Sequence, residues 1–215
     1  MRRNHSIDNI PFAENLVFYA PLTEGDLTDH VSRTSMVDGN RGTYIWDSEK
    51  KMYLFSFTNS SSGTVGYWDV NLRMSTIETQ SYTLFCKIIC DDVSSGRPYV
   101  FGLGNFDMSN SYKPSVCAGH YYGRNSNQKI ESISYIAAVR DGLQGKLYYY
   151  PCVNNQWDES STGTHMSNPE NWNNINLCGS RVCVCIRRDN FAPKFWIKDA
   201  RVYNRALSAQ DLAQL

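Results

Sequence analysis

The sequence predicts an all-β fold, a sandwich or a barrel of short strands, and three observations favour it. The 215-residue chain is rich in aromatic residues, with 14 Tyr, 9 Phe and 5 Trp, and aromatic side chains suit the half-buried surface of a pleated sheet. Short apolar or alternating segments recur along the chain, as they do in sandwiches and barrels. Between these segments, 14 glycines and many Asn and Ser residues supply turns.

The N-terminal region predicts an arm followed by one domain. Residues 1–14 hold few apolar side chains, and Pro11 stops a helix, so we expect an extended arm there. Leu16–Ala20 is an apolar run that ends at Pro21 and predicts the first strand. Because no internal repeat or linker follows, residues 15–215 are expected to form one sandwich domain.

Further strands follow from the pattern of apolar residues. Thr23–Gly42 is polar and is expected to be a loop. Met52–Phe57 is a near-continuous apolar run bounded by turn residues, which predicts a buried strand. Tyr82–Cys90 alternates with apolar groups on both faces, as expected of a central strand whose two faces are both covered. Pro98–Leu103 predicts another short strand.

The second half predicts a hairpin, a late strand and a short helix. Ile133–Val139 and Lys146–Tyr150 read as a hairpin around the turn signal Asp141-Gly142, and Val182–Ile186 reads as a late strand. A helix is expected at Ala209–Leu215. Its signals are a Ser208 N-cap, Asp211 three residues later, and Leu207 and Leu212 at the positions of a hydrophobic staple.

The charge balance and the apolar runs limit the classes of partner that we expect this chain to bind. Lys and Arg total 21 and so do Asp and Glu, so the basic surplus that marks nucleic-acid binders is absent from the totals. The sequence shows no apolar run long enough for a transmembrane helix, and no membrane insertion is expected. The first residues, with two arginines and no apolar core, do not read as a secretory signal. We therefore expect a protein made in the cytoplasm.

Cysteine usage agrees with that location. The odd number of cysteines, without a secretion signal, argues against a disulfide framework. A zinc site needs about four ligands in paired spacings, and the chain contains no C-x-x-C while its four histidines are scattered. We therefore expect reduced cysteines that pack as small hydrophobes. The seven cysteines are Cys86, Cys90, Cys117, Cys152, Cys178, Cys183 and Cys185.

The last 21 residues, FWIKDARVYNRALSAQDLAQL, resemble the closing segment of concanavalin A-like, laminin-G-like domains, which has the form I-x-D-x-R-[IV]-Y-N-R-A-L-S. The matching residues are Ile197, Asp199, Arg201, Val202, Tyr203, Asn204, Arg205, Ala206, Leu207 and Ser208. Weaker matches follow in the right order upstream, at Leu16–Leu22, Asp29, Ser81–Lys87, Val139–Gly142 and Lys146–Tyr148.

The resemblance implies a two-sheet antiparallel jelly-roll sandwich with a short C-terminal helix. Members of this superfamily mostly bind glycans or proteins, and some are glucanases. It implies a structural, hydrogen-bonding role for Asp199. No cofactor is expected. A structural calcium ion is left open near Asp26 and Asp29, because calcium takes six or more oxygen ligands and two aspartates do not define such a site.

Catalysis is not expected. The superfamily's glucanases carry E-x-D-x-x-E on one strand, which holds two carboxyl groups about 5–5.5 Å apart for retaining hydrolysis. This motif is missing here. The adjacent pairs Asp91-Asp92 and Asp158-Glu159 point to opposite faces if extended. A glucanase-like hydrolase is therefore the least favoured alternative.

Two segments have the composition of a glycan site, which needs an aromatic platform beside planar polar side chains. One lies around Gly119–Asn125, and the other combines Asn154–Asp158 with Asn171–Asn174. The alternative is that these rings cover the core or a subunit interface. The candidate ligand-binding residues are His120, Tyr121, Tyr122, Arg124, Asn155, Trp157, Asp158 and Trp172.

Two functions remain open from the sequence, and they are compatible. The chain is either a free carbohydrate- or protein-binding adhesion protein, or a structural, decoration or attachment component of a larger assembly such as a phage virion. The second follows from a fold that suits display, together with the absent secretion signal and reduced cysteines. Expected partners are therefore other proteins of an assembly and a glycan; a homo-oligomer is left open.

Overall fold

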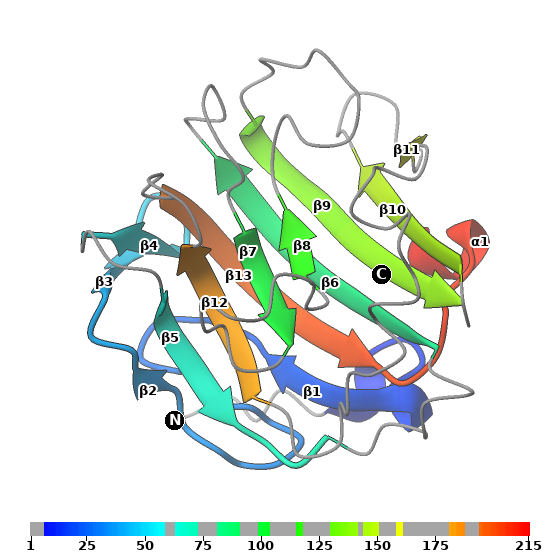
Figure 1. Ribbon diagram of the computed structural model, residues 1–215, viewed down its shortest axis with the longest axis horizontal. Coiled ribbons are helices and arrows are strands. Elements are labelled where there is room, and N and C mark those ends of the chain that lie inside the picture. The colour runs from blue at the N-terminus through cyan, green and yellow to red at the C-terminus, as the bar shows by residue number, and fades with distance from the viewer. Residues whose placement is uncertain are drawn as a thin grey trace.

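Two antiparallel sheets pack face to face in the computed structural model (Figure 1). The structure describes residues 7–58, 63–72, 81–90, 99–103, 115–117, 130–141, 144–150, 158–160, 181–187 and 194–215. All pairings between the described strands are antiparallel. The predicted all-β jelly-roll sandwich is therefore confirmed.

The larger sheet has eight strands in the order β11-β10-β9-β6-β13-β4-β3, and β1 pairs with β13 beside this path. These strands are β1 Leu16–Ala20, β3 Gly42–Asp47, β4 Met52–Phe57, β6 Tyr82–Cys90, β9 Ile130–Asp141, β10 Gln144–Tyr150, β11 Asp158–Ser160 and β13 Lys194–Tyr203. The smaller sheet has the order β2-β5-β12-β7-β8. Its strands are β2 Val37–Asp38, β5 Gly63–Asp69, β7 Tyr99–Leu103, β8 Ser115–Cys117 and β12 Arg181–Arg187.

Most predicted strands are present, and three of them, β1, β4 and β6, have the predicted bounds. The predicted hairpin is longer, since pairing continues to Asp141 opposite Gln144. Five strands were not predicted: β2, which lies within the expected loop Thr23–Gly42, and β3, β5, β8 and β11. β5 contains Gly63 and Gly66, and glycine usually weakens a strand. Gly66 fits here because the Met36 sulfur lies 2.6 Å from where a Cβ would stand.

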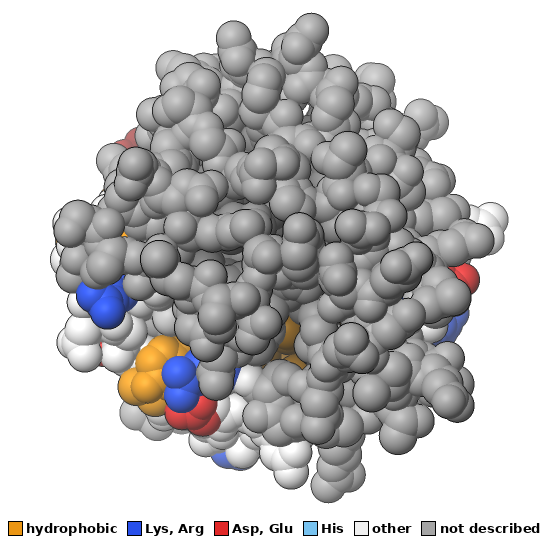
Figure 2. All heavy atoms as spheres, in the orientation of Figure 1, with side chains coloured by type: hydrophobic (Ala, Val, Ile, Leu, Met, Phe, Trp, Pro, Cys, Tyr) orange, Lys and Arg blue, Asp and Glu red, His pale blue; other side chains and the backbone are white. Residues whose placement is uncertain are grey.

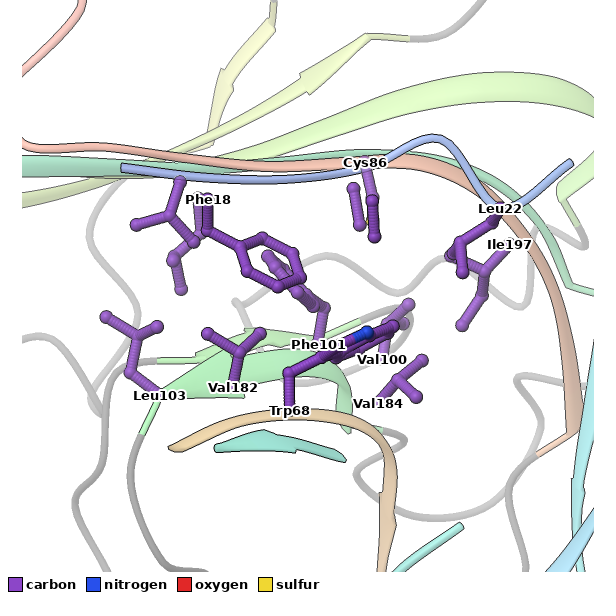
Figure 3. Packing of buried hydrophobic residues seen from close by; sticks show 14 of the residues in the cluster. Phe18, Leu22, Trp68, Cys86, Val100, Phe101, Leu103, Val182, Val184 and Ile197 are labelled. Carbon is purple, nitrogen blue, oxygen red and sulfur yellow. The ribbon is translucent and has the colours of Figure 1, made fainter. Parts of the chain in front are cut away.

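Aromatic rings from both sheets meet in the core. The rings of Phe18 and Trp68 lie 5.1 Å apart, edge to face, and those of Phe18 and Phe101 lie 5.9 Å apart (Figure 3). The Trp68 indole N–H donates to the Leu27 carbonyl at 2.8 Å, so its polar end is satisfied. Cys86 shares this core, and burial raises the pKa of its thiol. A buried neutral thiol packs as a small hydrophobe, as predicted.

The outward face of the larger sheet is covered by the chain's two ends. Ile7, Ile10 and Phe12 from the N-terminal side and Leu212 from the C-terminal side pack against its apolar positions, with Leu16, Tyr19, Phe85, Ala137, Val139, Tyr203 and Leu207. Residues 7–14 contain the 3₁₀ turn Ile7–Asn9 and most of a second, Ala13–Asn15. This part of the expected arm is therefore folded rather than extended, because its apolar side chains have a surface to cover.

The C-terminal helix α1 spans Ala209–Leu212 and has the predicted capping box. The Asp211 N–H donates to the Ser208 hydroxyl at 3.1 Å, and the Ser208 N–H donates to the Asp211 carboxylate at 3.0 Å. The helix stops short of the predicted Leu215 because the last two N–H groups donate to carbonyls only three residues back. Among the described residues, no helix is long and apolar enough to cross a membrane.

Strand β13 contains a β-bulge at Asp199, which has a left-handed backbone with φ of 58°. On one edge β13 pairs with β4 up to Ile197 and with β1 from Ala200, so the bulge lies where the partner changes. The Asp199 N–H donates to the Pro21 carbonyl at 3.1 Å. A left-handed backbone is uncommon for a non-glycine residue, but aspartate tolerates it better than most.

Asp199 also holds two cations on the outward face, the buried Arg201 and the half-buried Lys87. Its carboxylate accepts hydrogen bonds from Nε and Nη2 of Arg201 at 2.6 and 2.8 Å, and Lys87 Nζ lies 2.8 Å away. Burial raises the pKa of the Asp199 carboxyl, but the charges of Arg201 and Lys87 outweigh burial and hold that pKa below its ordinary value. The structural role that the resemblance implies for Asp199 is therefore present.

A polar loop covers the free edge of β1. The Asp29 carboxylate, which is fully buried, accepts hydrogen bonds from the N–H groups of Tyr19, Val31 and Ser32 and from the Ser32 hydroxyl. The His30 N–H donates to the Tyr19 carbonyl at 2.7 Å. The backbone groups at the edge of β1 are therefore satisfied by this loop.

We predict that Asp199→Asn lowers the free energy of unfolding by about 3–5 kcal/mol, because it leaves the buried Arg201 charge uncompensated. Asparagine also tolerates the left-handed backbone, so the substitution isolates the electrostatic effect. Urea unfolding followed by tryptophan fluorescence measures it. Glu24→Gln is the control, since it makes the same kind of change, a carboxylate to an amide, at an exposed loop position. An Asp199→Asn protein within about 0.5 kcal/mol of wild type would contradict the prediction.

We predict that acid lowers the free energy of unfolding through protonation of Asp26. Burial raises the pKa of Asp26, but its hydrogen bonds to His30 and Thr28 outweigh burial and hold the pKa below its ordinary 3.8. A carboxyl with a lowered pKa in the folded state contributes stability above its ordinary pKa and loses it as the pH falls through the folded value. The free energy of unfolding should therefore drop below about pH 4, and drop less in Asp26→Asn. Equal pH profiles of the two proteins would refute this.

Candidate functional site

The ligand-binding residues predicted from the sequence lie almost entirely outside the described residues. Asp158 is the exception, because it is the first residue of β11, although only its backbone is described. The other seven, for which the site stays a prediction, are His120, Tyr121, Tyr122, Arg124, Asn155, Trp157 and Trp172.

The described strands that flank two of these segments end toward the same side of the larger sheet. Ile130, which opens β9, pairs with Cys90 at the end of β6, and Tyr150 at the end of β10 pairs with Tyr135 of β9. These ends lie at the top of Figure 1. The start of β9 and the end of β10, from which segments 118–129 and 151–157 continue along the chain, therefore lie on one side of the larger sheet. Trp172 falls in the sequence between β11 and β12 and lies outside the described residues.

A second surface, within the described residues, has the chemistry of a glycan site. Tyr67 and Asp69 of β5 alternate with the core residue Trp68, so they face away from the other sheet. Arg181 of β12 is opposite Asp69. Figure 2 shows apolar, basic and acidic side chains together over β2 and β5. We call Tyr67, Asp69 and Arg181 the β5–β12 surface.

The β5–β12 surface is held together by two contacts. The Arg181 guanidinium lies 3.7 Å from the Tyr67 ring centroid, and its Nε donates to Asp69 Oδ1 at 2.7 Å. Partial burial lowers the pKa of Arg181, but the hydrogen bond and charge of Asp69 outweigh burial and raise that pKa overall. The cation is therefore permanently charged and orientated by both neighbours.

Arg181 and Asp69 keep exposed hydrogen-bonding atoms that a ligand could contact. The side chains of Arg181 and Asp69 are 32% and 58% exposed. Within the described part of the chain, Nη1 and Nη2 of Arg181 and Oδ2 of Asp69 have no hydrogen-bond partner. A donor fork beside a carboxylate acceptor matches neighbouring sugar hydroxyls, each of which both donates and accepts. Sequence reasoning missed this site because β5 was not predicted; a Tyr and an Asp flanking the apolar Trp68 were the available signal.

The other described aspartates already have structural partners. Asp199 binds Arg201 and Lys87, and Asp26 binds His30 at 2.8 Å. The Asp47 carboxylate accepts the Trp196 indole N–H at 2.8 Å. The side chains of Asp158 and Glu159 and all of Asp91 and Asp92 fall outside the description. Asp26, Asp47 and Asp199 therefore stabilise the fold through these contacts.

Calcium at Asp26 and Asp29 finds little support in their geometry. Asp29 accepts three hydrogen bonds from its own loop and one from Tyr19 of β1, which uses the lone pairs that a calcium ion would need. Asp26 accepts from the Thr28 N–H and contacts His30. Among the described residues, no group of three or more His, Cys, Asp or Glu side chains is placed to hold a metal ion.

Comparison with known proteins supports the fold alone. No family model matches the chain, and no curated protein matches it by sequence. Three solved structures are similar: the binding domain of botulinum neurotoxin DC in complex with rat synaptotagmin II, the botulinum neurotoxin serotype D ligand binding domain in complex with N-acetylneuraminic acid, and the binding domain of paraclostridial mosquitocidal protein 1.

The similarity is extensive in space and low in sequence. TM-scores for these three are 0.56, 0.57 and 0.58, and identities are 12%, 12% and 14%. Each match covers 93% of this chain and 50%, 50% and 51% of the other. The chain thus spans about half the length of these binding domains. The chain therefore has the fold of these binding domains, a two-sheet antiparallel jelly-roll sandwich, which is the fold that the C-terminal motif predicts.

Proposed function

We propose that this chain is a non-catalytic, lectin-like module that binds a glycan and serves as a structural, decoration or attachment component of a larger assembly such as a phage virion. The β5–β12 surface is the observation that carries the binding part. It places an aromatic ring, a guanidinium fork and a carboxylate side by side on an exposed sheet face. The alternative is a free carbohydrate-binding adhesion protein with the same surface.

Two further observations support binding over catalysis. The described aspartates outside the surface are engaged in ion pairs and hydrogen bonds that stabilise the fold. Structures with the same fold include one in complex with N-acetylneuraminic acid and one in complex with synaptotagmin II. Binding of a sugar or of a protein receptor is thus compatible with this fold, although fold does not determine function.

Two features support the proposed role in a larger assembly. A jelly roll presents its loops and sheet faces outward, which suits display on a particle. The buried Cys86 thiol, with its raised pKa, suits a protein that folds in a reducing compartment. We therefore propose that the chain is made in the cytoplasm and reaches a virion surface by assembly.

A glycan array with wild-type protein tests the binding proposal. We predict that Arg181→Lys weakens binding of the recognised glycan roughly tenfold or more, since lysine lacks the fork and loses charged hydrogen bonds. Arg33→Lys, the same substitution at an exposed position of the loop between β1 and β2, is the matched control. Trp157→Ala and Tyr121→Ala test the loop site predicted from the sequence. If wild type binds no glycan, glycan recognition is refuted.

Mass spectrometry of purified particles tests assembly. We predict that the chain co-purifies with particles from its native source in a fixed ratio to their other proteins, since a structural component occupies defined positions. Washing at high salt distinguishes incorporated from loosely adsorbed protein, because screening weakens adsorption through surface charges. Recovery only as free protein would favour the adhesion alternative.

A further inference from the structure

The edge strands of the two sheets differ in how they are protected. β2 has two residues, and β8 and β11 have three each. The edge of β1 is covered by the loop carrying Asp29 and His30. β3 has six residues and, among the described strands, pairs only with β4. It is therefore the longest open edge that the structure describes, and an open edge is a template for pairing with another chain.

The composition of β3 favours such pairing. Its sequence, GTYIWD, contains Thr, Tyr, Ile and Trp, which have high strand propensity, and neither Lys nor Pro. Proteins usually block exposed edges with those two residues or with a bulge. Ile45, near the centre of β3, is 61% exposed, the most of the described large hydrophobic residues.

The backbone pattern shows which groups of β3 face outward. The Thr58 N–H donates to the Arg41 carbonyl at 3.0 Å, in continuation of the β3–β4 register. Hydrogen-bonded positions alternate along an antiparallel pair, so residues 43, 45 and 47 bond toward β4. The N–H and C=O groups of Gly42, Tyr44 and Trp46 therefore point to the open edge.

This set of open groups is self-complementary. If two copies of β3 run antiparallel about a two-fold axis at Tyr44, Gly42 of one faces Trp46 of the other, and each such pair exchanges two hydrogen bonds. The same register places Arg41 opposite Asp47 of the second copy, at both ends. Opposite charges in cross-strand pairs are favourable. Within one copy, Arg41 also packs against Gly63, and Asp47 also lies 3.6 Å from Lys50, so the self-complementary backbone is the main support for this register.

The side chains on the outward face support the same register. Ile45 pairs with Leu54, Leu54 with Trp196, and Trp196 with Ile89, which makes an apolar row across four strands. The row ends at the exposed Ile45. In the two-fold register, Thr43 of the second copy stands beside Ile45, so the methyl groups of both residues would extend the row across the junction.

We propose that a second copy of this chain pairs with β3 along its open edge, antiparallel about Tyr44, and joins two larger sheets into one. The interface is isologous, as in most homodimers. It goes beyond the proposed function because it does not depend on the ligand. Two copies joined in this way would present two β5–β12 surfaces in fixed relation.

Sedimentation of the full chain at several concentrations tests the dimer. Because the junction is small, wild type should pass from monomer to dimer as its concentration rises over about 1–100 μM. Ile45→Lys and Thr43→Lys should remain monomeric across that range, since lysine at an edge opposes pairing. Val31→Lys, which also places lysine at an exposed apolar site, should dimerise as wild type does. A monomer at every concentration, or dimers unaffected by both β3 variants, would overturn the proposal.

Cysteine cross-linking tests the register. Thr43 and Ile45 of the two copies form non-hydrogen-bonded pairs, whose Cα atoms lie about 4.5 Å apart, within disulfide reach. A mixture of Thr43→Cys and Ile45→Cys proteins should therefore form heterodimers under mild oxidation. Either variant alone should cross-link no more than wild type, which controls for the native cysteines. Equal cross-linking of single variants and mixture would exclude this register.

Discussion

Strand β13 has to pair with three strands over ten residues, and the sandwich depends on how it does so. One edge follows β6 throughout, while the other passes from β4 to β1. A regular strand cannot serve two partners on one edge without an adjustment between them. The bulge at Asp199 provides it, and Arg201 and Lys87 neutralise the carboxylate that the bulge directs to the outward face.

This requirement explains why so many consecutive residues of the C-terminal motif make specific contacts. Ile197 and Val202 enter the core, Asp199 and Arg201 stabilise the bulge, and Tyr203 packs under the chain's ends. The Arg205 carbonyl accepts the Thr83 hydroxyl at 2.9 Å, and Ser208 caps the helix. Since these side chains serve the fold, the motif identifies an architecture and carries no information about a ligand. Recognition has to come from residues outside it.

The two features for which we propose a role in binding lie on the outside of the sandwich. The β5–β12 surface lies on the outward face of the smaller sheet, and the open edge of β3 belongs to the larger sheet. A sugar contact of this size is weak by itself. When two copies are held in a fixed relation and one has bound a sugar, the effective concentration of the second site is raised. Two weak sites can therefore bind a multivalent glycan surface tightly. Glycan binding and self-association would thus reinforce each other, whether the chain is free or part of a particle.

Local patterns in the sequence determined the all-β class, most of the longer strands and the capped helix, because alternation, turns and capping depend on neighbours in the chain. The jelly-roll type and the structural role of Asp199 came from the resemblance of the C-terminal motif. Sequence reasoning missed β2, β3, β5, β8 and β11. It also expected residues 1–14 to be extended, whereas the described residues 7–14 are folded. Those outcomes depend on contacts with distant residues, such as Met36 beside Gly66 and the apolar surface beneath Ile7 and Phe12. Only the tertiary structure decided which polar side chains share a surface: Tyr67 and Arg181 are more than a hundred positions apart, and strand pairing alone brings them together.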